Sequence, residues 1–591
     1  MTDDLTAAAL ASITSVLQRS TVCVAWSGGK DSSALLNLVM QAARALRARG
    51  VALRPIIVTN GDTGVENPEI RTYVDTEIAR VRAFARAHDI PLEIAVSKPT
   101  LSESWQCRVI GGRALPSFPG TNHDCTTELK ISPMTRLRKQ VLGKTGPSDP
   151  GTVTLIGTRF EESPSRAARM SERGETADAP WVGDDGGWYL SPIALWGADD
   201  VWTHLSHCRN GRPGYKTFSD FEDVFRIYAD AAGTSCAVVG DLSSRDNAKP
   251  CGARTGCWCC TPVGRDKSLE AMIEGDPKYA YLLGLNRLQR FLVNTRWDLS
   301  RRNWLGRSID EDGYVAVAPD AYSPEMLKAL LRYCLTLDEQ ERERAAKSGI
   351  APRFEIIDVR TLIAIDAMWN LQGFHRPFEA WAVYRDIHQR GARYPVPEVA
   401  PVPRPQTLPA KRFLFVAEGW RDHRFLGLRD PVQELSSAES ACMGTRVLRN
   451  GTQVMDMEQG VCFDIDAEGA WMFVDYELDR CLRGRARFGI TDGYLTYTRL
   501  GLLSLPPSSV GVIDGILKRT AWKHEHGLAG QTDPQDLINR SVARKDRSPP
   551  SPSVPDLPPA SPRGVQLPFA LRQQEGLALD AQDDVSCRPG R

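Results

Sequence analysis

The sequence predicts an α/β fold whose first part is a parallel sheet covered by helices on both faces. A short apolar run at residues 21–26 is followed by a glycine turn and then by apolar residues at helical spacing from Asp31 to Arg49. Strand-like runs and one helical stretch alternate after it, at residues 51–59, 70–87, 92–96 and 152–157. Strands that alternate with helices pair in parallel through crossover connections, so we expect a sheet of this kind.

The first domain is predicted to span residues 1–206, because residues 181–206 add a strand, a loop and a helix in that order. Helical spacing then dominates residues 266–337 and 360–389. We therefore predict a second, helical domain that carries a cluster of cysteines over residues 207–394.

The second half of the chain is predicted from composition. Residues 395–411 are proline-rich, which is typical of a stiff, extended linker. Residues 412–538 resume a globular composition, with short β-rich runs at 412–417 and 470–474, and predict a smaller α+β domain. Ser, Pro and charged residues dominate residues 539–591, which predicts a disordered tail.

Composition limits the functional classes. The 73 basic residues balance the 73 acidic ones, whereas a protein that holds nucleic acid unaided usually carries a basic excess. We find neither a secretory leader nor an apolar run long enough to span a bilayer, and we expect a cytoplasmic protein without a membrane partner. Disulfides are rare in that compartment, so the local clustering among 14 cysteines needs a metal or redox explanation.

A phosphate-binding loop is predicted between the first strand and the first helix. Backbone N–H groups and a helix N-terminus form an anion site there, and glycines allow close approach of a phosphate. Lys30 would meet phosphate charge, and Asp31 would hold Mg²⁺ or order the turn. The spacing differs from that of a Walker A loop, which disfavours a motor that cleaves a γ-phosphate. The alternative is a tight turn with solvated charges. The loop residues are Ser27, Gly28, Gly29, Lys30, Asp31, Ser32 and Ser33.

Two other segments follow predicted strands at the same end of the sheet. Asp62 and Thr63 come directly after the second strand, at the carboxyl end where open α/β sheets bind ligands. After the fourth strand come Arg159, Glu162 and, about one turn further, Arg166. The two arginines are candidates for clamping a phosphate, and the alternative for them is an exposed, ion-paired helix start.

These segments resemble those of a known superfamily. Ser27-Gly-Gly-Lys-Asp-Ser32 is similar to the PP-loop of the adenine-nucleotide α-hydrolases, which split ATP between its α- and β-phosphates, and residues 157–163 resemble their G-x-R-x-x-E-S motif. Residues 188–202 resemble the segment that ends the nucleotide domain of the PAPS reductase superfamily. The resemblance implies an ATP pyrophosphatase that adenylylates its substrate and uses ATP and Mg²⁺. It assigns catalytic roles to Lys30, Asp31, Arg159 and Glu162.

The clustered cysteines predict a metal site. Cys251, Cys257 and Cys260 have a spacing that lets three thiolates face one metal, and glycines between them let the loop bend. We predict Cys125 as the fourth ligand because it lies at the rim of the first domain, with Cys259 as its substitute. From the residues alone, structural zinc and iron–sulfur are equally supported, and a redox pair of Cys257 with Cys260 is the third alternative.

The cysteine segments resemble one family in particular. Residues 125–131, 251–258 and 261–268 are similar to those of the DndC-like, or SspD-like, DNA phosphorothioation proteins. The resemblance covers residues 15–390 and implies a [4Fe–4S] cluster on Cys125, Cys251, Cys257 and Cys260.

It further implies that a DNA backbone phosphate is adenylylated so that sulfur can replace a non-bridging oxygen. The implied partners are a cysteine desulfurase, other DNA sulfur-modification proteins and DNA, which the neutral net charge suggests is presented by those proteins. The alternatives are a PAPS or adenylyl-sulfate reductase, a PP-loop tRNA thiolase and a zinc-stabilised interaction module without activity.

Overall fold

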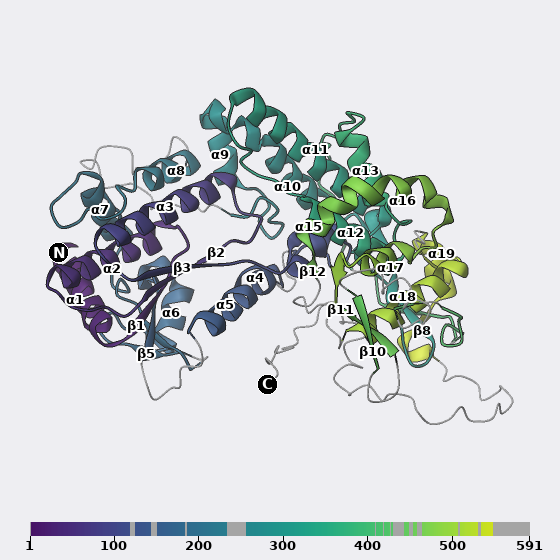
Figure 1. Ribbon diagram of the computed structural model, residues 1–591, viewed down its shortest axis with the longest axis horizontal. Coiled ribbons are helices and arrows are strands. Elements are labelled where there is room, and N and C mark those ends of the chain that lie inside the picture. The colour runs from purple at the N-terminus through teal and green to yellow at the C-terminus, as the bar shows by residue number, and fades with distance from the viewer. Residues whose placement is uncertain are drawn as a thin grey trace. The chain divides into compact units, whose positions relative to one another are not determined.

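The structure is a computed structural model (Figure 1), in which two compact units are distinguished. Unit 1 consists of residues 1–99, 119–290 and 349–354, and unit 2 consists of residues 100–118, 291–348 and 355–591. The structure describes residues 2–118, 124–142, 151–183, 186–232, 256–407, 409–417, 419–425, 427–428, 443–447, 453–457, 464–505, 509–529 and 533–547.

Unit 1 contains a six-stranded sheet in the order β3-β2-β1-β4-β6-β5. All neighbouring strands are parallel except the edge pair β5 and β6, which is antiparallel. Figure 1 shows α2 and α3 on one side of the strands and α5 and α6 on the other. The strands are β1 (Thr21–Ala25), β2 (Ile56–Gly61), β3 (Leu92–Ser97), β4 (Thr152–Leu155), β5 (Trp181–Val182) and β6 (Trp188–Leu190).

Helices join and flank these strands. They are α1 (Thr2–Arg19), α2 (Lys30–Ala48), α3 (Pro68–Ala87), α4 (Asp124–Thr126), α5 (Ser132–Leu142), α6 (Pro164–Glu172), α7 (Ala198–Arg209), α8 (Glu222–Ala232), α9 (Lys267–Gly275) and α10 (Leu283–Thr295). The unit also contains the π-helix η3 (Thr127–Ile131) and the 3-10 helices η4 (Phe160–Glu162) and η7 (Pro277–Leu282). Helix α10 begins in unit 1, and its residues from 291 belong to unit 2. The predicted α/β fold with a mostly parallel sheet is thereby confirmed.

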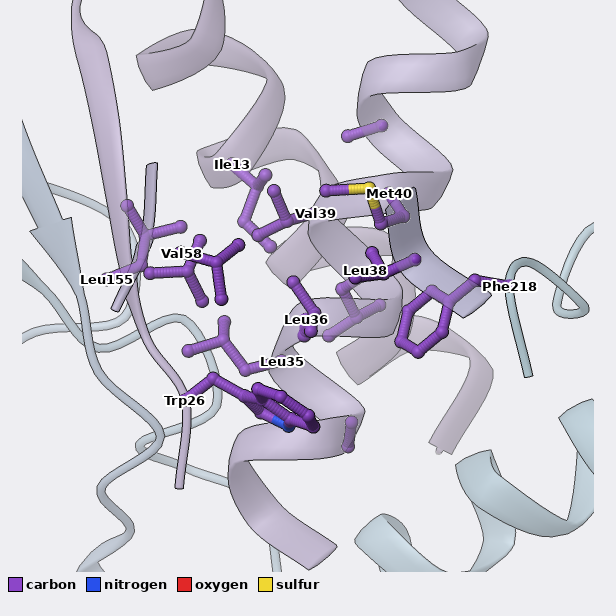
Figure 2. Close-up of a cluster of buried hydrophobic side chains, with 14 of the residues drawn as sticks. Ile13, Trp26, Leu35, Leu36, Leu38, Val39, Met40, Val58, Leu155 and Phe218 are labelled. Atoms are coloured by element: carbon purple, nitrogen blue, oxygen red, sulfur yellow. The ribbon is translucent and has the colours of Figure 1, made fainter. Parts of the chain in front are cut away.

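The core of unit 1 lies between the sheet and α2. Figure 2 shows Val58 and Leu155, from the two strands that flank β1, pointing toward Leu35 and Leu36 of α2. These four side chains are fully buried. Burial of apolar surface stabilises the fold by about 25 cal/mol per Å², so these contacts hold α2 against the two strands that flank β1.

The same core continues past the predicted end of the first domain. Phe218, Phe221, Phe225 and Ile227 belong to it, so α8 packs with the six-stranded sheet in unit 1. The division into two units is coarser than the five predicted segments and does not test their boundaries.

Unit 2 holds a four-stranded antiparallel sheet in the order β14-β9-β8-β7, with helices around it. Its strands are β7 (Arg302–Ile309), β8 (Tyr314–Tyr322), β9 (Arg412–Phe415) and β14 (Val542–Ala543), and two further pairs join β10 (Met443–Val447) to β11 (Gln453–Met457) and β12 (Asp464–Ile465) to β13 (Leu503–Ser504). Its main helices are α11 (Pro324–Ser348), α12 (Val359–Gln372), α13 (Glu379–His388), α15 (Ala467–Met472), α16 (Leu478–Gly484), α17 (Asp492–Arg499), α18 (Val510–Glu525) and α19 (Pro534–Arg540).

Three details of the sequence prediction are wrong in unit 2. Strands β7 and β8 form a hairpin where helix dominated the prediction, since Gly313 adopts a φ of +77° in the turn between them. Residues 470–474 are helical instead of β-rich, because Asp466 caps α15 by accepting from the Gly469 N–H. The predicted tail from 539 is ordered at first, because β14 pairs with β9. Residues 548–591 lie outside the described residues.

None of the helices in the described ranges is both long and apolar enough to cross a membrane.

Candidate nucleotide site and cysteine segments

The candidate nucleotide site lies where the order of the sheet reverses. Strand β1 is flanked by β2 on one side and β4 on the other. The chain that leaves the carboxyl end of β1 therefore continues to one side of the sheet, and the chain that leaves the carboxyl end of β4 continues to the other side. Ligands of open α/β sheets bind in the crevice at such a point. The two loops approach closely, since a Cβ atom on Gly157 would lie 3.2 Å from the backbone carbon of Asp31.

The predicted phosphate loop has the backbone that an anion site needs. Gly28 adopts a φ of +78°, and a Cβ atom there would lie 2.5 Å from Cγ2 of Val74. Gly29 is the N-cap of α2 and has no side chain to cap the helix, so the loop itself presents backbone N–H groups. The Ser27 hydroxyl accepts from the Gly29 N–H (3.4 Å) and lies 3.0 Å from the Ser32 hydroxyl, which holds the loop in shape.

Three charged side chains meet at the start of α2. Nζ of Lys30 lies 2.9 and 2.8 Å from the two carboxylate oxygens of Asp31. Nε of Arg159 donates to Oδ1 of the same carboxylate over 2.6 Å, and its Nη1 donates to the Trp196 carbonyl over 3.3 Å. Asp31 therefore orders the turn, as one of the two predicted roles requires. Its role toward Mg²⁺ stays a prediction.

The structure places Glu162 beside Arg159 and Arg166. Its Oε1 accepts from the Arg159 N–H over 3.3 Å, and its Oε2 forms an ion pair with Arg166. The Arg166 side chain is 43% exposed, whereas that of Arg159 is 4% exposed. This is the ion-paired helix start that was the alternative for Arg166. In this arrangement Glu162 positions both arginines, and the part each plays toward a nucleotide stays a prediction.

Asp62 and Thr63 follow β2 as predicted. The Asp62 carboxylate accepts from the Gly64 N–H (3.0 Å) and lies 3.1 Å from Nζ of Lys98. The Thr63 hydroxyl is buried without a hydrogen-bond partner among the described residues. Both residues lie in the loop between β2 and α3, and later residues of this loop contact the cysteine segment.

The cysteine segment contacts this loop through its backbone. The Trp258 N–H donates to the Val65 carbonyl over 3.0 Å, and Glu66 and Cys257 form an isolated antiparallel bridge. The Cys260 N–H donates to the Cys257 carbonyl over 3.0 Å, which closes a turn between the two thiols. Gln289 then fastens the segment by donating to the Cys260 carbonyl over 2.8 Å. The cysteines thus lie beside the loop that leaves β2.

Cys125 is near enough to the cysteine segment to influence the pKa of the Cys257 thiol. Burial raises the pKa of Cys257 to about 11; Lys130 lowers it, and Cys260, Glu66 and Cys125 raise it further. Burial, followed by the neighbouring thiols, also raises the pKa of Cys259. A bound metal cation would reverse this balance, since a coordinated thiol is deprotonated.

The metal site itself is only partly described. Cys125, Cys257 and Cys260 are within the described ranges, but Cys251 lies outside them. Among the residues that the structure covers, no group of three or more His, Cys, Asp or Glu side chains is arranged to hold a metal. The four-thiol ligand set and the choice between iron–sulfur and zinc therefore stay predictions.

Two residues near the loops were absent from the sequence prediction. Burial, with the charge of Asp62 next, raises the pKa of Glu66 to about 7. Tyr228 of α8 reaches the phosphate loop, where its hydroxyl accepts from the Lys30 N–H over 3.4 Å. Glu66 could have been noticed as a second carboxylate four residues after Asp62, in the same segment after the second strand. Nothing in the sequence around Tyr228 indicates that its hydroxyl contacts Lys30.

One comparison with known proteins covers this part of the chain. Residues 21–209 match the family model of the phosphoadenosine phosphosulfate reductase domain. The match supports the PAPS reductase superfamily and an enzyme that uses ATP through a PP-loop. It spans β1 to α7 and includes every predicted nucleotide-site residue. No curated protein matches the chain.

Two similar solved structures are those of Candida glabrata FMN adenylyltransferase, one with FMN and an ATP analogue and one with FAD and pyrophosphate. Each is 13% identical to this chain, with TM-scores of 0.21 and 0.22. The alignments cover 35% of this chain and 57% and 59% of those chains, so the chain spans less than two thirds of their length. A likeness of this size carries no functional implication.

Proposed function

We propose that this protein is an ATP pyrophosphatase that activates a DNA backbone phosphate for exchange of oxygen by sulfur. The observation that carries the nucleotide part is the meeting of Lys30, Asp31 and Arg159 at the point where the sheet order reverses, inside the matched domain. The DNA part is supported by the resemblance of the cysteine segments to those of DNA phosphorothioation proteins.

The residues of the loop divide the work of binding ATP. The N–H groups at the start of α2 and the charge of Lys30 receive phosphate oxygens. When a phosphate draws Lys30 away, Asp31 remains held by Arg159, which keeps the turn in place and leaves a carboxylate oxygen for Mg²⁺. The Glu162 carboxylate holds the backbone of Arg159 in place by accepting from the Arg159 N–H.

In the proposed reaction an oxygen of the DNA phosphate attacks the α-phosphorus of ATP. The bond between the α- and β-phosphates breaks, pyrophosphate leaves with Mg²⁺, and DNA carries an AMP group. The terminal sulfur of a persulfide from a cysteine desulfurase then displaces AMP, which departs with the original oxygen. A second thiol attacks the remaining sulfur–sulfur bond, yielding a disulfide and the DNA phosphorothioate.

Cys125, Cys251, Cys257 and Cys260 would hold a [4Fe–4S] cluster in this proposal, with zinc as the alternative. A cluster supplies one-electron redox chemistry, whereas zinc would supply a structural cross-link. The bridge from Cys257 to Glu66 brings this segment to the loop that carries Asp62 and Thr63. Other DNA sulfur-modification proteins would present the DNA.

Release of pyrophosphate from ATP tests the proposal, measured with the DNA substrate and a cysteine desulfurase present. Lys30→Ala is expected to abolish release, while Lys216→Ala, an exposed lysine of the same unit, should keep it. In the same reaction mixture, mass spectrometry of nuclease-digested DNA should show phosphorothioate dinucleotides with the wild-type chain and none with Lys30→Ala. Full turnover by Lys30→Ala would contradict the nucleotide assignment.

The matched family model favours one other function, a phosphosulfate reductase. The Glu-Cys-Gly-x-x-His active-site element of those enzymes does not occur within residues 1–591. Sulfite formation from phosphoadenosine phosphosulfate with thioredoxin as the reductant separates the two functions. Sulfite release with no DNA phosphorothioate would favour the reductase.

A further inference from the structure

Tyr228 stands at the phosphate loop although it comes from a helix far along the chain. Its hydroxyl accepts from the Lys30 N–H, the first N–H group of α2, over 3.4 Å. A Cβ atom on Gly29 would lie 3.6 Å from the same hydroxyl. The hydroxyl therefore lies against the first turn of α2, where helix N–H groups have no partner within the helix and a phosphate would bind.

The position of Tyr228 is fixed by packing. Its ring packs edge-on against Trp202 of α7, with ring centroids 5.3 Å apart and an interplanar angle of 81°. Helix α8 is anchored on both sides of Tyr228. Asp223 lies 3.4 Å from Arg80 of α3, and Asp230 accepts from the Tyr279 hydroxyl over 2.6 Å. A side chain held in this way loses little entropy when it binds a ligand.

A phenol can accept or donate a hydrogen bond, whereas a phosphate oxygen only accepts. When a phosphate enters the loop, the Lys30 N–H can donate to it, and the Tyr228 hydroxyl can rotate its hydrogen toward the same oxygen. Hydrogen bonds to a charged acceptor are stronger than the neutral contact that they replace.

We propose that Tyr228 binds a phosphate group of the nucleotide and replaces its contact with the Lys30 N–H by a hydrogen bond to that phosphate. This inference rests on the nucleotide-binding part of the proposed function. It adds a residue from outside the matched residues 21–209 to the nucleotide site.

The test is equilibrium binding of ATP and of inorganic pyrophosphate, each with Mg²⁺, to the full-length chain by titration calorimetry. Tyr228→Phe keeps the ring and removes only the hydroxyl, so it should weaken both ligands by roughly tenfold to a hundredfold, as the loss of one hydrogen bond to a charged group does. Its thermal midpoint should stay within about 2 °C of wild type, because the packing is unchanged. Tyr215→Phe is the matched control, since the Tyr215 hydroxyl donates to Asp3.

The possible outcomes are distinct. If wild type binds ATP and Tyr228→Phe binds it equally well, the inference about Tyr228 is wrong and the proposed function stands. If Tyr215→Phe loses as much affinity as Tyr228→Phe, the effect is a general one and the inference also fails. If the wild-type chain binds neither ATP nor pyrophosphate, both the inference and the proposed function fail.

Discussion

Nε of Arg159 donates to Oδ1 of Asp31 over 2.6 Å, although 128 residues separate them in the sequence. The contact joins the loop after β4 to the first turn of α2, on either side of the point where the sheet order reverses. The Arg159 side chain is almost completely buried, and its charge is balanced by this carboxylate and by that of Glu161, whose Oε2 lies 3.5 Å from Nη1. Arg159 thus determines the shape of the phosphate loop.

Replacing Arg159 should damage folding and activity together. Arg159→Met keeps most of the side-chain volume but leaves Asp31 without this partner, so we expect a loss of about 2 kcal/mol in the free energy of unfolding. Urea titration measures the stability and pyrophosphate release measures activity, which should fall at least about tenfold. Arg166→Met is the control, since this more exposed arginine should cost less than about 1 kcal/mol. Equal stability losses in the two variants would contradict the assignment.

Gly28 should tolerate no side chain. Gly28→Ala places a Cβ atom 2.5 Å from Cγ2 of Val74 at a φ of +78°, so strain and a clash add together. Gly50→Ala is a matched control, because Gly50 has a φ of +76° but nothing within 4 Å of the added atom. Both variants should lose about 1 kcal/mol from backbone strain, and Gly28→Ala should lose more.

The double variant Gly28→Ala with Val74→Ala separates the two effects, because it removes the clash and keeps the strain. It should bind ATP more tightly than Gly28→Ala alone, as measured by titration calorimetry. Indistinguishable ATP affinities for wild type and Gly28→Ala would show that the close approach of Gly28 and Val74 is unimportant for the site.

Much of unit 1 was predictable because its signals are local. The apolar run before Ser27 and the helical spacing after Asp31 define a strand, a turn and a helix without reference to the rest of the chain. Parallel strands then place the loops after β1, β2 and β4 at one edge, which is why Asp62 and Arg159 could be placed at that edge from the sequence.

Contacts that depend on packing across long separations in sequence were not predictable. Tyr228 reaches Lys30 only because α8 joins the core of the sheet, and the pattern of α8 does not show which helix it packs against. Similarly, the bridge between Glu66 and Cys257 has no counterpart in the spacing of either segment. The β7–β8 hairpin was missed because the Asp312-Gly313 turn was outweighed by apolar residues at helical spacing.

Metal analysis should separate iron–sulfur from zinc at the cysteine site. Protein purified without oxygen is expected to contain about four irons and matching acid-labile sulfide per chain. Cys257→Ser should lose the metal, because a hydroxyl is a poor ligand for soft metals. Cys334→Ala, which alters a buried cysteine of α11 in unit 2, should keep it. About one zinc per chain without sulfide would contradict the iron–sulfur prediction.

Lys523 should make the stability of unit 2 depend on pH. Burial, helped by the charges of Arg519 and Arg307, lowers the pKa of Lys523 from 10.5 to about 7, and its Nζ donates to the Arg307 carbonyl over 3.2 Å. Because the folded-state pKa is below the unfolded one, the stability that this group contributes is complete above pH 10.5 and is lost as the pH falls to about 7.

Lys523→Met removes the titrating group and keeps an apolar chain of similar length. Its stability relative to wild type should therefore rise steadily as the pH is lowered from about 9 to 7 and level off below about 7. Urea midpoints of the two proteins between about pH 6 and 9 measure the difference, with Lys518→Met on the same helix as the control. A constant difference across this range would show that Lys523 does not lose its proton in the folded protein.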